Sequence, residues 1–148
     1  MLRLELLLRH GGVYVDSDLE PVRALDPLLR DGKAFAVRED ANCIPDFVLG
    51  APPNHPAIRQ CLDMVLAMDP AILFNKDGKG PWHSGPGITT QVFTKRDDVT
   101  VLPSVTFAPY HWSRKAQDGD KDWTQNPQTY GIHRWAASWS GAQGHQPT

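Results

Sequence analysis

Cysteine is scarce in this sequence, and no long apolar run is present. Cys43 and Cys61 are the two cysteines, and their spacing is unlike that of metal ligands. We therefore expect free buried thiols in a reducing compartment, with a single disulfide as the open alternative. No segment approaches the roughly 20 apolar residues of a membrane-spanning helix, and the first residues lack the layout of a signal peptide. These features predict a cytoplasmic location.

Clusters of basic residues are also absent. The 148 residues carry a net charge of −2, and lysine and arginine form no patch or run, which argues against binding to nucleic acid. The length suits one domain that buries about two thirds of its unfolded surface. Thirteen prolines and twelve glycines predict many short elements joined by turns.

The N-terminal stretch around Gly11-Gly12 is the most informative part of the chain. Leucines at positions 4, 7 and 8 have helical spacing, so we predict a helix over residues 2–10. The two glycines then provide a helix C-cap and let another group approach the backbone closely. Val13-Tyr14-Val15 is β-branched and aromatic, which predicts a buried strand.

Asp16 and Asp18 follow this strand, one residue apart. Because strand side chains alternate in direction, both carboxylates should project to the same side. Two such carboxylates repel each other unless a cation lies between them, and their oxygens suit Mg²⁺ or Mn²⁺. Such a pair is also common at ordinary polar strand ends. Its place after two glycines and a strand favours a metal–diphosphate site, since ligands bind at the strand ends of open sheets.

Helices and turns further along the chain follow from local patterns. Glu20-Pro21 should break the first strand, and a helical turn should follow over 25–29. We predict one helix that begins at Pro56 and another at Pro86, because proline presets the first helical position. Asn54 or His55 should lie near the cap of the helix that begins at Pro56, and His55 and Asp63 are expected at the surface.

The remaining segments are expected to be strands and loops. We expect turn-rich or polar loops over 40–46, 69–84 and 113–126, a core tryptophan at Trp135, and a flexible tail over 140–148. The predicted strands cover 34–38, 47–51 (central in the sheet), 99–103, 105–109 (at an edge) and 130–133.

Four segments occur in an order that is typical of one family. The first runs from Arg3 through Gly11-Gly12-Val-Tyr-Val-Asp16-Ser-Asp18 to Pro21 and is the most specific. The others are residues 25–29, Gly85-Pro86-Gly87 and 132–139. Together they resemble glycosyltransferase family 32, the sugar-binding region containing a DXD motif.

The resemblance implies an α/β fold of the GT-A type, a mixed sheet flanked by helices as in nucleotide-diphospho-sugar transferases. Residues 1–139 would be the C-terminal portion of that domain, since family members have an N-terminal half of the nucleotide-binding sheet upstream. We therefore expect Met1 to be an internal methionine, and this chain by itself to be a catalytically incomplete fragment.

The resemblance also implies roles for individual residues. Asp16 and Asp18 would be the catalytic pair, and His133 would join them as a neutral third ligand of Mn²⁺ or Mg²⁺. Arg3, thirteen residues before Asp16, would hold the donor sugar. Trp139 would stack on the nucleotide base. The expected substrate contacts are Arg3, Gly12, Tyr14, Asp16, Gly85, Pro86, Gly87, Ser138 and Trp139.

The implied activity is a metal-dependent, retaining transfer of a hexose from a UDP- or GDP-sugar to a glycan or other hydroxyl acceptor, as in polysaccharide biosynthesis. Such an enzyme needs no protein nucleophile, and we nominate none. Peripheral membrane association through the acceptor is left open. The alternative is a non-catalytic, metal-dependent carbohydrate- or nucleotide-binding module, a truncated or decayed transferase; a plain structural domain is the third. Base, sugar, acceptor and oligomeric state do not follow from the sequence.

Overall fold

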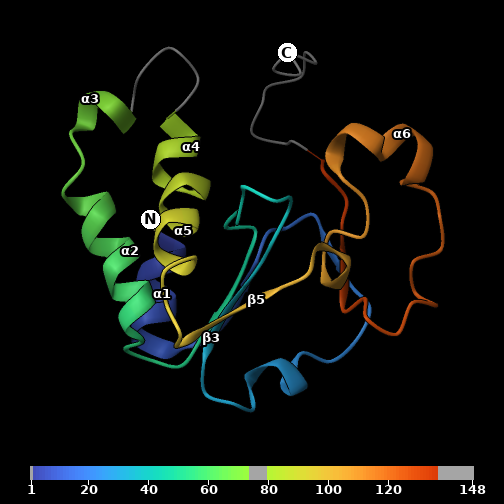
Figure 1. Cartoon of the computed structure of the whole chain (residues 1–148), viewed down its shortest axis with the longest axis horizontal. Helices are drawn as coiled ribbons and strands as arrows, with labels where there is room; N and C mark the ends of the chain where they lie inside the picture. Colours follow the sequence, from blue (N-terminus) through green and yellow to red (C-terminus); the bar gives the residue numbers. More distant parts are fainter. Residues whose placement is uncertain (1, 74–79, 137–148) are drawn as a thin grey trace.

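The computed structural model describes residues 2–73 and 80–136, in which a four-stranded sheet is covered on one side by helices (Figure 1). Strand β1 (Gly12–Val15) pairs antiparallel with β4 (Val48–Ala51), and β4 pairs antiparallel with β3 (Ala34–Val37). Strand β5 (Val99–Leu102) lies parallel to β3. The order β1-β4-β3-β5 confirms the predicted α/β class with a mixed sheet flanked by helices, and the predicted central place of β4.

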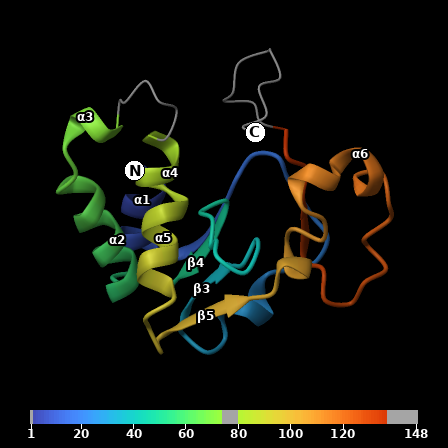
Figure 2. The same cartoon turned by 45° about the horizontal axis from the view of Figure 1, so that its top comes forward.

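Alternating side chains of the central strands enter two separate cores. Ala34, Ala36 and Leu49 face the helices, whereas Phe35, Val37 and Val48 enter a second core on the other face. The helical layer consists of α1 (Leu2–His10), α2 (Pro56–Leu66) and α5 (Pro86–Phe93), as Figure 2 shows. Because side chains alternate in direction along a strand, Ala34, Ala36 and Leu49 lie on the face toward the helices, and Phe35, Val37 and Val48 lie on the opposite face.

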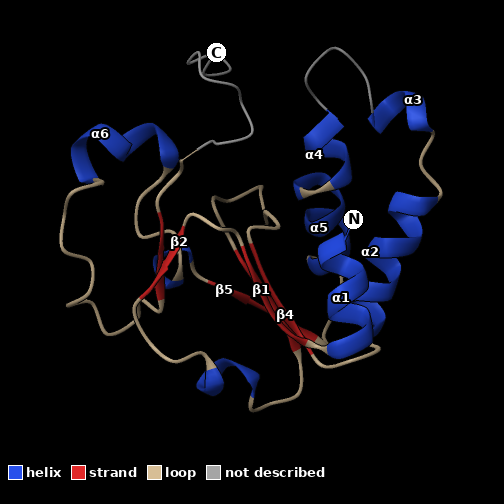
Figure 3. Ribbon diagram, turned by 180° about the vertical axis from the view of Figure 1, so that it is seen from behind, coloured by secondary structure: helices blue, strands red, loops and turns tan. Residues whose placement is uncertain are grey.

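A second, two-stranded sheet lies beside the first and pairs the segment that follows β1 with the last strand of the described chain (Figure 3). Strand β2 (Leu19–Pro21) pairs antiparallel with β6 (Gly131–His133), and Leu19 is opposite His133. The remaining elements are short: η1 (Asp26–Leu29), α3 (Pro70–Leu73), α4 (Gly80–Ser84), η2 (Ser104–Thr106), η3 (Trp112–Arg114) and α6 (Lys115–Asp118).

Several predictions about strands are wrong, and pairing partners explain why. Strand β1 is at an edge of the sheet and is only partly buried, with Val15 38% exposed, so it is not the buried strand expected. Glu20-Pro21 does not interrupt strand structure but lies in β2, where Pro21 is the last residue. Residues 105–109 form no edge strand, since Ser104–Thr106 is a 3₁₀ turn. That segment still accepts backbone hydrogen bonds from Tyr130 and His133.

Other corrections concern loops and one histidine. The expected loop over 69–84 is helical in α3 and α4, and part of the expected loop over 113–126 forms η3 and α6. Asp118 in α6 is buried and pairs with Arg114 and Lys121, whose hydrogen bonds and charges lower its pKa to about 2. His55 is buried rather than exposed, because it caps α2 by accepting a hydrogen bond from the Ala57 amide.

The predictions about cysteine can be compared directly with the structure. Cys43 and Cys61 are both buried free thiols, as expected, and burial raises the pKa of each to about 12.

Within residues 2–73 and 80–136, none of the helices has both the length and the apolar character needed to span a bilayer.

Candidate functional site

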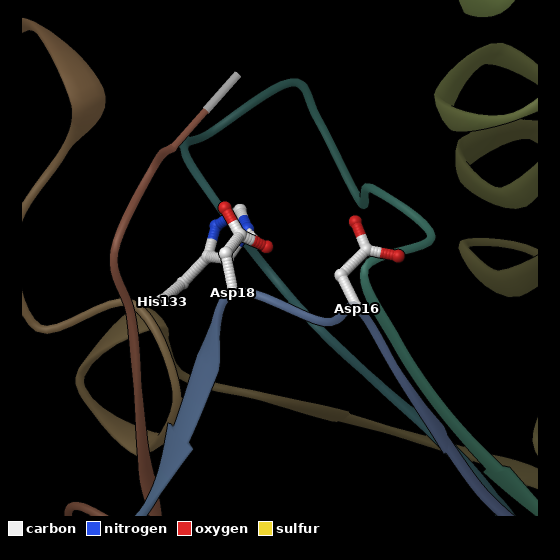
Figure 4. Close-up of side chains that lie close together, drawn as sticks. All are labelled: Asp16, Asp18 and His133. Carbon is white, nitrogen blue, oxygen red and sulfur yellow. Dashed lines mark hydrogen bonds and ion pairs between the residues drawn. The ribbon is translucent and has the colours of Figure 1, made fainter. Parts of the chain in front are cut away.

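The two aspartates flank the turn that leads from β1 into β2. The Asp16 amide donates to the carbonyl of Phe47 at 2.8 Å, which extends the β1–β4 pairing by one residue. The Leu19 amide then donates to the Asp16 carbonyl at 3.1 Å and closes the turn. Figure 4 shows both carboxylates on the same side of this turn, with His133 reaching toward Asp18 from β6. One potential ligand atom from each of these three side chains lies within 4.8 Å of the others.

The last strand and the residues directly after it hold Asp18 from two directions. His133 Nε2 lies 3.1 Å from Asp18 Oδ1, and the Ala136 amide donates to Asp18 Oδ2 at 2.8 Å. The Arg134 amide donates to the Asp18 backbone carbonyl at 3.0 Å. Because β2 and β6 are paired, these contacts fix the carboxylate before any ligand arrives.

The ring of His133 is enclosed by aromatic side chains. Phe47 stacks on it with ring centroids 4.4 Å apart, and Trp135 meets it edge-on at 4.1 Å. Burial lowers the pKa of His133, and the nearby Asp18 and Asp16 carboxylates offset this only in part. Its Nδ1 is buried without a hydrogen-bond partner among the described residues. The ring is therefore held as a neutral imidazole, the form that ligates metals.

Asp16 lies beside an arginine from the first helix and a tyrosine of its own strand. Arg3 Nη1 lies 3.3 Å from Asp16 Oδ1, and the Tyr14 hydroxyl donates to the same oxygen at 2.6 Å. The Arg3 guanidinium also lies over the Tyr14 ring, 4.4 Å from its centroid. Burial and the hydrogen bond to Asp16 raise the pKa of Tyr14 to about 12, so its hydroxyl remains a donor.

A third carboxylate, Asp46, shares the same arginine. Arg3 Nη1 donates to the Asp46 backbone carbonyl at 2.8 Å and lies 3.2 Å from Asp46 Oδ2. Burial raises the pKa of Asp46, and the Arg3 charge opposes that rise. Arg3 is thus a fixed cation between two acids, and not the solvated helix residue that its position alone would suggest.

The donor set around Asp16 and Asp18 fits a hard divalent cation. Opposite ligands of a small octahedral ion lie about 4.2 Å apart, so ligand atoms within 4.8 Å of one another need only small side-chain adjustments. Two carboxylates balance a charge of +2, and a neutral imidazole adds none. Both described donors to Asp16 use Oδ1, which leaves the lone pairs of Oδ2 for a cation.

The other predicted substrate residues are placed less uniformly. Gly12 is exposed at the start of β1 with φ +94°. Gly85, Pro86 and Gly87 open helix α5 as predicted, and a Cβ at Gly85 would lie 2.9 Å from both Asp46 carboxylate oxygens. Gly85 therefore adjoins Asp46, whereas a Cβ at Gly87 would lie 3.0 Å from the Trp82 carbonyl. Ser138 and Trp139 lie outside the described residues.

Three contributors to this site were not predicted from the sequence. They are the Asp46 contact with Arg3, the Phe47 ring on His133 and the Ala136 amide on Asp18. Once the β1–β4 register is known, the Asp16–Phe47 backbone bond places the 46–47 segment beside the acid pair. A correct prediction of that register would have indicated both the Asp46 contact with Arg3 and the position of the Phe47 ring.

Comparison with known proteins supports the resemblance in the segment that carries the acid pair. Residues 1–35 match the family model described as "Glycosyltransferase sugar-binding region containing DXD motif". The resemblance implied by the motif is thereby confirmed over this segment. No curated protein matches the chain.

Among solved structures, the chain is similar to one described as "PaToxG Glycosyltransferase". The two are 23% identical, with a TM-score of 0.49. The match covers 64% of this chain and 32% of the solved chain, so the present chain spans about a third of that protein's length.

Proposed function

We propose that this chain carries the metal and donor-sugar site of a retaining glycosyltransferase, which moves a hexose from a UDP- or GDP-sugar to a glycan or other hydroxyl acceptor. The observation that carries the proposal is that Asp16, Asp18 and His133 converge beside Arg3. The two aspartates and Arg3 belong to the segment that matches the family model, and His133 reaches them from β6. Asp16, Asp18 and His133 would hold Mn²⁺ or Mg²⁺. When bound there, the cation would supply Lewis-acid stabilisation of the leaving diphosphate.

The chain's own residues orient the reactants in this proposal. Asp18 is already oriented by His133 and by the Ala136 amide, and a cation bound by Asp18 and His133 would replace the proton that these two groups share. Within the described part of the chain, every hydrogen bond of Arg3 uses Nη1. Its Nε and Nη2 hydrogens are then free to bind hexose hydroxyls. The acceptor attacks from the face that the diphosphate leaves, so no protein nucleophile is needed.

The best test is turnover of a donor sugar by the chain. UDP- and GDP-hexoses are incubated with the protein and Mn²⁺, and release of the nucleoside diphosphate is measured with and without a hydroxyl acceptor. The proposal expects release of the nucleoside diphosphate from one donor class. This release should stop when EDTA is added and in the Asp18→Asn variant. It should persist in Asp63→Asn, which makes the same charge change on the exposed surface of α2.

The same experiment separates the alternative functions. Metal-dependent binding of the nucleotide without release from any donor would contradict transfer by this chain alone, and would fit both a catalytically incomplete fragment and the non-catalytic binding module. Absence of both binding and release would contradict the donor site as well, and would leave a structural domain. Adding lipid vesicles that carry a glycan acceptor tests whether the protein associates peripherally with membranes through the acceptor.

A further inference from the structure

Arg3 is shared between two carboxylates. Its Nη1 lies 3.2 Å from Asp46 Oδ2 and at nearly the same distance, 3.3 Å, from Asp16 Oδ1, and it also donates to the Asp46 backbone carbonyl at 2.8 Å. All three contacts use the same nitrogen. The distance between this nitrogen and Asp16 therefore depends on its contacts with the Asp46 carbonyl and carboxylate.

Asp46 is held in place from behind by the start of helix α5. A Cβ at Gly85 would approach both Asp46 carboxylate oxygens to 2.9 Å, so glycine is what allows the carboxylate to lie there. The Asp46 side chain is 22% exposed, similar to the 28% of Arg3. The pair is screened from solvent enough for charge to matter over a few ångströms.

A cation bound by Asp16 must compete with Arg3 for the same carboxylate. The guanidinium is permanently charged, so its full pairing with Asp16 would oppose the approach of a second positive charge. We propose that Asp46 is a positioning residue, which holds Arg3 partly away from Asp16 and so keeps Asp16 able to bind a divalent cation. This inference rests on the proposed metal site. Without a charge at position 46, Arg3 pairs more closely with Asp16, and metal affinity falls.

The experiment is a Mn²⁺ titration of the whole chain, in which free Mn²⁺ is followed by its electron paramagnetic resonance signal. Asp46→Asn keeps the shape of the side chain and removes its charge. We expect it to weaken Mn²⁺ binding by roughly three- to tenfold, in the lower part of the range of coupling between contacting residues. Asp63→Asn removes the same charge from an exposed site on α2 and should leave the affinity within twofold of wild type.

A second background tests whether Asp46 acts through Arg3. The Arg3→Gln variant lacks the guanidinium that Asp46 holds in our proposal. The Mn²⁺ affinity of the double variant Arg3→Gln/Asp46→Asn should therefore be within twofold of that of Arg3→Gln alone. An equal loss in both backgrounds would overturn the proposal, because Asp46 would then act through its own charge. Thermal unfolding of each variant checks that affinity is compared between folded proteins.

Asp18→Asn distinguishes failure of this inference from failure of the metal site. If wild type binds Mn²⁺ and Asp18→Asn does not, while Asp46→Asn behaves like Asp63→Asn, only the role of Asp46 is overturned. If wild type and Asp18→Asn bind Mn²⁺ equally or not at all, the metal site fails and the inference fails with it. A selective loss in Asp46→Asn that disappears in Arg3→Gln supports the proposal.

Discussion

His133 Nε2 lies 3.1 Å from Asp18 Oδ1, although the two residues are 115 positions apart in the chain. The contact is made possible by the β2–β6 pairing, which places Leu19 opposite His133. One end of the described chain thereby completes a site whose acids come from the other. The prediction from sequence that His133 stands beside the acid pair agrees with this geometry, while its role as a metal ligand stays a proposal.

The buried ring of His133 predicts a loss of stability in mild acid. Its pKa is lowered in the folded protein from an ordinary value of 6.5, chiefly by burial, so the unfolded chain takes up the proton more readily. Stability from this group is then complete above pH 6.5 and declines as the pH falls below it. His133→Gln loses ring packing and should be less stable at pH 8 by about 1–3 kcal/mol.

Urea denaturation of wild type and His133→Gln across pH 5 to 8 measures this difference. Because the glutamine takes up no proton, the gap in unfolding free energy should narrow as the pH falls below 6.5. Taking the difference between the two proteins removes the contribution of the other histidines. A gap that stays constant or widens in acid would show that His133 does not resist protonation.

The close approach of Gly85 to Asp46 predicts that alanine is poorly tolerated at position 85. A Cβ 2.9 Å from both carboxylate oxygens forces Asp46 to move, against its contacts with Arg3. Overpacking of this kind costs about 1–3 kcal/mol, and the reduced entropy of the unfolded chain returns some of that. We expect a net loss near 1 kcal/mol in chemical denaturation. In an Asp46→Ala background the obstacle is gone, and an undiminished loss there would refute the contact as its cause.

Asp46 itself should reduce stability at neutral pH. Burial raises its pKa above the ordinary 3.8 despite the neighbouring Arg3, so the folded state favours the protonated carboxyl. Its contribution to stability is then complete below pH 3.8 and is lost as the pH rises through the higher folded value. Asp46→Asn should accordingly be at least as stable as wild type at pH 7, and this advantage should shrink toward pH 4. Thermal melting at both pH values is the check, and an advantage that grows in acid would contradict the account.

The parts of the site that follow from the sequence are those set by local pattern. Leucine spacing in residues 2–10 and the β-branched run 13–15 predicted α1 and β1. Asp16 and Asp18 share a side as predicted, but they lie in the turn between β1 and β2, so the alternation of strand side chains is not the reason. Helices α2 and α5 begin at Pro56 and Pro86 as predicted, because proline acts within a single turn of helix.

The parts that did not follow depend on pairing between distant segments. Local propensity predicts a break at Glu20-Pro21, yet both residues belong to a strand because they pair with β6. Asp46 meets Arg3 only because the β1–β4 register brings the 46–47 segment beside the acid pair. His55 was expected near the cap of α2 but at the surface; it does cap the helix, and its burial is the part that the local sequence does not indicate.

The central claim is that Asp16 and Asp18 grip a divalent cation on which a nucleotide diphosphate binds. The most direct measurement is the thermal unfolding midpoint of wild type and Asp18→Asn with UDP or GDP, with and without Mn²⁺. We predict that one nucleotide at about 100 times its Kd raises the wild-type midpoint by roughly 5 °C or more, only when Mn²⁺ is present, and that Asp18→Asn shows no such rise. An equal rise without Mn²⁺, or in Asp18→Asn, would contradict the claim.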